Sequence, residues 1–68
     1  MNKKDRLRIR RVFNRRQNNL VNVVGELALE KIYNDDENEV KDLDQEIHRI
    51  FWDIDELRRI EDEITKEE

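Results

Sequence analysis

Hydrophobic residues in the second half of the chain recur at alternating intervals of three and four. Written as a heptad, position a is occupied by Val40, Ile47, Ile54 and Glu61, and position d by Leu43, Ile50, Leu57 and Ile64. Seven of these eight positions are apolar, which is typical of a helix in a coiled coil or a helical bundle. The pattern predicts a helix over about residues 37–65.

The first half has a less regular apolar pattern that still follows a helical period. An apolar stripe is formed by Phe13, Leu20, Val24 and Leu27. Val23 and Leu29 lie away from this stripe, and a helix that is apolar around most of its circumference is buried by more than one neighbour. We therefore expect a helix over about residues 4–33. Gly25 weakens it or permits another backbone to approach closely, and we expect the basic arm to bend or fray near Asn18.

The segment between the two predicted helices, residues 34–38, is polar and acidic and predicts a turn. Asp36 followed three residues later by Glu39 resembles a capping box at the start of the second helix. Two long helices joined by a short link predict an antiparallel helical hairpin, with residues 1–68 forming a single all-α domain.

A hairpin of this size needs further stabilisation, because one small core rarely supplies more than about 3–5 kcal/mol. The chain has no cysteine, so disulfides cannot provide it. We expect the hairpin to self-associate into a homodimer, either a four-helix bundle or a coiled-coil-like assembly.

Apolar residues outside the main seam support this expectation. Phe51 and Ile60 fall beside the heptad seam, and together with Val23 and Leu29 they would be buried between two hairpins. Trp52 falls on the outer side of the second helix among acidic residues. Since exposed tryptophans often anchor protein interfaces, these five residues are the predicted protein interface.

The charge is divided unequally between the two halves. Residues 1–34 carry nine bases and three acids (+6), and residues 35–68 carry five bases and fifteen acids (−10), which gives −4 in total. In a hairpin the basic segment 1–16 lies beside the acidic segment 53–68, so the two can neutralise each other. The alternative is that the basic segment binds nucleic acid.

The nucleic-acid alternative depends on the arginine-rich N-terminal arm, residues 1–19. Its candidate residues are Arg6, Arg8, Arg11, Arg15 and Arg16. Three of them, Arg8, Arg11 and Arg15, share one helical face, and arginine-rich helices bind phosphate backbones. Deletion of residues 1–16 should distinguish the interpretations. Internal pairing predicts a destabilised fold with an unpaired acidic segment, whereas nucleic-acid binding predicts a surviving fold that no longer binds.

Residues for catalysis are scarce. The chain has no serine and no cysteine, one threonine (Thr65), and no glycine-rich phosphate loop, so we expect neither an enzyme nor a cofactor. The single histidine, His48, follows Asp44 by four residues, which is too little for a metal site. The longest apolar runs have three residues, which excludes a membrane span and a secretory signal and predicts a cytoplasmic protein.

Nine residues of the second half, ending at His48, resemble the small sporulation-regulating aspartyl-phosphate phosphatases. Those proteins are two-helix hairpins with a Ser-Gln-Glu-Leu-Asp signature in the second helix. Gln45 and Glu46 match the signature, and Ile47 replaces its leucine. Asp44 stands at the serine position and His48 at the position of the functional aspartate, so the resemblance implies no phosphatase activity.

The sequence as a whole predicts a small non-enzymatic interaction or regulatory protein that acts through protein–protein contacts and self-association. The alternative prediction is a nucleic-acid-binding regulator in which the N-terminal helix is the reader and the hairpin is the dimerisation element.

Overall fold

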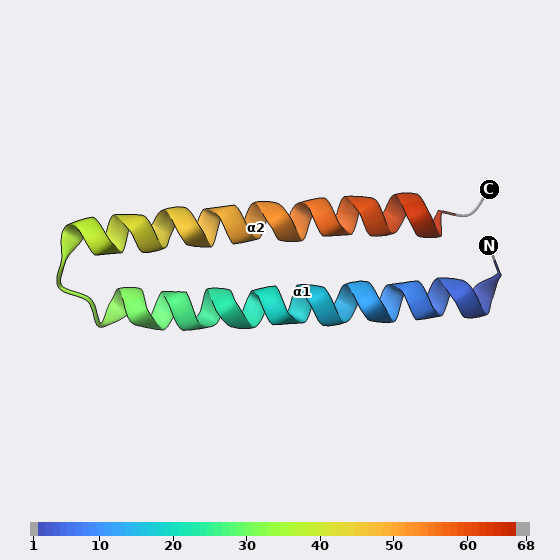
Figure 1. Cartoon of the computed structure of the whole chain (residues 1–68), viewed down its shortest axis with the longest axis horizontal. Coiled ribbons are helices and arrows are strands. Elements are labelled where there is room, and N and C mark those ends of the chain that lie inside the picture. The colour runs from blue at the N-terminus through green and yellow to red at the C-terminus, as the bar shows by residue number, and fades with distance from the viewer. Residues whose placement is uncertain (1, 67–68) are drawn as a thin grey trace.

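The computed structural model describes residues 2–66. They form two helices, α1 (Lys3–Ile32) and α2 (Glu37–Thr65), joined by a short link. The helices lie antiparallel along their whole length, so the start of α1 and the end of α2 are at the same end of the molecule (Figure 1). The predicted all-helical hairpin is thereby confirmed, and the predicted helix bounds agree with the observed ones to within one residue. Self-association stays a prediction.

Each helix begins at a side chain that accepts hydrogen bonds from its first turn. Asn2 Oδ1 accepts from the backbone N–H of Asp5 at 2.8 Å. Asp36 Oδ1 accepts from the N–H groups of Asn38 and Glu39 at 2.9 and 3.4 Å. These bonds satisfy backbone donors that have no partner inside the helix, and they confirm Asp36 as the N-cap of α2.

The predicted capping box is only half formed. The Glu39 carboxylate does not return to the Asp36 amide but accepts a hydrogen bond from Asn34 Nδ2 at 2.7 Å. The Asp36 N–H instead donates to Asn34 Oδ1 at 2.8 Å. Asn34 therefore replaces Glu39 in the box and holds the link against the first turn of α2.

The contact between the helices is one row of side chains from each. On α2, Ile50 and Ile54 are buried hydrophobic residues. Half-buried apolar residues around them are Val40, Leu43, Ile47 and Leu57 on α2, and Ile9, Phe13, Leu20, Val24, Leu27 and Ala28 on α1. Two helices can enclose no more than such a row, so the apolar core of the single chain is small.

The seam of α2 leaves the heptad in its last turns. Glu61 and Thr65 are 7% and 3% exposed, whereas Ile64, predicted at position d, is 42% exposed. A straight α-helix drifts by about 20° per heptad relative to a 3.5-residue repeat. After three heptads this drift places the next inward residue four positions after Glu61, at Thr65. The prediction that Ile64 faces inward was therefore wrong.

Helix α1 continues without a break from Lys3 to Ile32 and runs straight (Figure 1), so the predicted bend or fraying near Asn18 was also wrong. Glycine and asparagine cost up to about 1 kcal/mol each in a helix. Packing of Leu20 and Val24 against α2 outweighs these local preferences, because tertiary contacts provide most of the stability of a helix in a protein.

Candidate interaction surfaces

Large apolar side chains remain on the outside of the hairpin, including all five residues of the predicted protein interface. Trp52 is 63% exposed. It lies two residues from each of the buried Ile50 and Ile54, and two residues correspond to a rotation of about 200°. Leu29 is related in the same way to the inward Leu27. Trp52 and Leu29 therefore lie on the outer sides of α2 and α1.

One broad face of the hairpin is marked by the ion pair between Lys31 Nζ and Asp44 Oδ1, at 2.6 Å. Residues three, four or seven apart share a side of a helix. Phe51 follows Asp44 by seven residues, Ala28 precedes Lys31 by three, and Val21 precedes Ala28 by seven. The exposed Phe51 ring thus belongs to the same face as Val21 and Ala28.

The opposite broad face carries Val23 and Ile60. A shallow hollow of about 300 Å³ on this face is lined by Arg16, Leu20, Asp53, Glu56 and Leu57. Val23 follows Leu20 by three residues, and Ile60 follows Leu57 by three, so both exposed side chains lie beside the hollow. The five predicted interface residues thus occupy four sides of the molecule, and one contact cannot bury them all.

Polar side chains join the two helices at the open end of the hairpin, where α1 begins and α2 ends. Both oxygens of the buried Glu61 carboxylate accept hydrogen bonds, from Arg10 Nη1 at 3.3 Å and from Gln17 Nε2 at 3.2 Å. Thr65 Oγ1 donates to the Glu61 carbonyl at 2.7 Å. The sequence pattern showed Glu61 only as the polar exception in the seam, and Gln17 was missed.

The basic and acidic segments pair through some of their charged side chains. Arg10 and Glu61 form an ion pair that joins them. Of the predicted nucleic-acid residues, Arg6 is half-buried on the inner side of α1, and Arg8, Arg11, Arg15 and Arg16 are exposed. Within residues 2–66 these last four make no ion pair or hydrogen bond.

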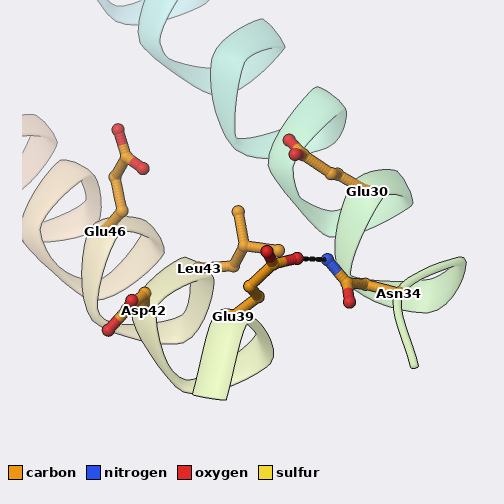
Figure 2. A pocket seen from close by; sticks show the side chains of 6 residues that line it. All are labelled: Glu30, Asn34, Glu39, Asp42, Leu43 and Glu46. Carbon is orange, nitrogen blue, oxygen red and sulfur yellow. Dashed lines mark hydrogen bonds between the residues drawn. The ribbon is translucent and has the colours of Figure 1, made fainter. Parts of the chain in front are cut away.

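Four carboxylates surround a hollow of about 240 Å³ near the link (Figure 2). They belong to Glu30, Glu39, Asp42 and Glu46. In Figure 2 the side chains of Asp42 and Glu46 point apart, and Glu39 is bonded to Asn34. No group of three or more metal-ligating side chains converges anywhere in residues 2–66.

The Asp44 and His48 side chains likewise do not converge on a common metal site. His48 Nδ1 lies 2.7 Å from the Asp44 carbonyl oxygen and donates to it, because a carbonyl oxygen only accepts. The Asp44 carboxylate is held by Lys31. Neither helix in the part of the chain that the structure describes combines the length and apolar content needed to cross a membrane.

Comparison of the chain with protein-family models, with curated proteins and with solved structures finds no match.

Proposed function

We propose that this chain is a small non-enzymatic interaction module whose working form is a homodimer. The observation that carries the proposal is a second row of small and apolar residues along α1, of which three are exposed and one, Ala28, is half-buried. We call Val21, Gly25, Ala28 and Ile32 the second seam.

The second seam has the 4-3-4 spacing of a helix–helix contact. Ile32 at one end is 71% exposed, and Val21 at the other end is also exposed. A Cβ atom added at Gly25 would meet nothing within 4 Å. Nothing in the single chain therefore requires a glycine at position 25. Glycine there also weakens the helix. A close approach by another helix would give it a role.

A second copy fits this surface because the seam is symmetric in spacing. Two antiparallel copies related by a two-fold axis would place Val21 of one beside Ile32 of the other, and Gly25 beside Ala28. Small residues at the centre let the helix axes approach closely, and larger ones close the ends. Phe51 lies on the same face as Val21 and Ala28 and would cover the flank of the contact.

Charge also favours this antiparallel arrangement. In the register that pairs Val21 with Ile32, the residues of α1 that precede Val21 lie beyond the last residue of the neighbour's α1, Ile32. The basic segment of each copy then extends beyond the link of its neighbour. A parallel dimer would set the two basic segments side by side, and like charges at close range oppose association.

The substitution Gly25→Leu tests the proposal. Leucine favours helix over glycine by about 0.8–1 kcal/mol, and the single chain has space for it. We expect the variant to keep its helical circular dichroism but to sediment as a monomer of 8.4 kDa. The parent should sediment near 2 × 8.4 = 16.8 kDa at about 100 µM.

Asn22→Leu is the matched control, since it adds the same side chain to an exposed position of α1 outside the second seam. This variant should keep the mass of the parent. A parent that sediments as a monomer, or a Gly25→Leu variant that associates as strongly as the parent, would contradict the proposal. Contact of Trp52 with a different protein, a regulatory role and a cytoplasmic location stay predictions.

A further inference from the structure

The outer side of α1 carries a row of four bases, Lys4, Arg8, Arg11 and Arg15, which we call the basic row. Arg11 lies two residues from both Ile9 and Phe13, and Arg15 two residues from both Phe13 and Gln17. Those neighbours are half-buried against α2, so a rotation of about 200° turns the basic row away from it. All four bases are exposed.

The acids of α2 do not neutralise the basic row. Within residues 2–66, none of the four bases makes an ion pair or a hydrogen bond. The axes of packed helices are about 8–10 Å apart, and the basic row lies beyond α1 on the far side. Since the Debye length at physiological salt is about 8 Å, the attraction of the α2 acids is largely screened there.

From this arrangement we infer that the basic row binds the phosphate backbone of nucleic acid. The row runs from Lys4 to Arg15, and eleven steps of about 1.5 Å along the helix give it a length of about 16 Å. Neighbouring members have Cβ atoms about 5–6 Å apart. Long basic side chains at this spacing can contact several phosphates of one strand, and the arginine guanidinium pairs with phosphate through two parallel hydrogen bonds.

Two further features of α1 fit a phosphate ligand. A shallow hollow of about 230 Å³ is lined by Lys4, Leu7, Arg8 and Arg11, so three cationic side chains surround it. The row continues at the same spacing with the exposed Asn18 and Asn22. Their amides can donate to sugar and phosphate oxygens next to the charged contacts.

A nucleic acid fits the basic row better than an anionic membrane does. A helix that lies in a membrane surface needs a broad apolar face that enters the lipid. In α1 the apolar face opposite the basic row is packed against α2 through Ile9, Phe13 and Leu20. The basic row also lies outside the second seam, so this inference does not depend on the proposed dimer.

The test is titration of the full chain into a fluorescently labelled 20-base-pair duplex and a single strand of equal length, followed by anisotropy at several salt concentrations. For duplex DNA, each phosphate neutralised contributes about −0.9 to the slope of log K against log salt concentration. Four contacts predict a slope near −3.6. The variant Arg8→Gln, Arg11→Gln, Arg15→Gln should reduce its magnitude by about 2.7 and weaken binding more than tenfold in low salt.

The matched control removes three positive charges from exposed positions of α2, as Lys41→Gln, Arg49→Gln, Arg58→Gln. This control changes the net charge by the same amount as the variant of the basic row. It should bind as tightly as the parent, to within about threefold, because it removes no phosphate contact. Circular dichroism should show all three proteins equally helical. The inference is overturned if neither strand form binds in low salt, if the control loses as much affinity, or if vesicles of anionic lipid bind and nucleic acid does not.

Discussion

Glu61 shows how one residue can set the alignment of two helices. It occupies a seam position where an apolar side chain would pack better. Its carboxylate instead accepts hydrogen bonds from Arg10 and Gln17, which lie two turns apart on α1. Apolar seams tolerate sliding by a full heptad, whereas a buried carboxylate needs its own partners. We infer that Glu61 selects the register of the hairpin and that its contribution to stability is secondary.

Substitution of Glu61 separates these two contributions. Glu61→Ala should lower the free energy of unfolding by about 1–3 kcal/mol, because Gln17 loses its partner and packing is lost. The double substitution Gln17→Leu, Glu61→Leu should leave the free energy of unfolding unchanged or raise it, since a buried polar pair is often replaced by apolar residues without loss when both partners are replaced. Urea denaturation at one protein concentration measures both. A double leucine variant less stable than the Glu61→Ala variant would show that the polar contacts themselves stabilise the fold.

At the scale of the elements, periodicity and caps predict the helices well. The bounds of α2 follow from seven apolar seam positions and from Asp36, both visible in the sequence. Asn34 could not be foreseen, because its two hydrogen bonds depend on how the link folds back on the first turn of α2. The bend expected near Asn18 was wrong because propensity is a weak guide where a helix is packed along its length.

The cap of α2 can be tested by Asp36→Ala, with Asp35→Ala as the matched control. Asp36 accepts two backbone hydrogen bonds, so its loss should lower the free energy of unfolding by about 1 kcal/mol. Asp35 is exposed, and its side chain makes no hydrogen bond or ion pair within residues 2–66. Asp35→Ala should lower the free energy of unfolding by less than about 0.5 kcal/mol. Equal losses in chemical denaturation would show that the cap contributes nothing specific.

At the scale of the whole molecule, the sequence predicts that the helices pair but not which polar residues face inward. Three polar residues face inward at the open end: Gln17, Glu61 and Thr65. There the inward residues of both helices follow one another at intervals of four, and not at the alternating three and four of a heptad. Helical rotation distributes the five residues of the predicted interface over four sides of the molecule. Exposed apolar residues are visible in a sequence, but their grouping depends on which side faces the other helix.

The arm contacts α2 with its inner side and carries the basic row on its outer side, so deletion of residues 2–16 removes both and cannot separate internal pairing from the proposed ligand binding. Ile9, Phe13 and Arg10 contribute to the contact with α2, while the basic row faces away. We expect the deletion to expose the last turns of α2 and unfold them. Hydrogen exchange should then show amides 57–65 unprotected and amides 40–50 still protected. Full protection of residues 57–65 would show that α2 is stable there without α1.

The single link between the helices determines the order in which the chain is expected to fold. The ion pair nearest the link joins residues 44 − 31 = 13 positions apart, whereas Arg10 and Glu61 are 51 positions apart. Closing the larger loop in one step costs about 1.2 kcal/mol more in chain entropy. Pairing should therefore start at the link and proceed to the open end, and opening should run in reverse. The segment with most of the positive charge is then the last to become ordered and the first to be released.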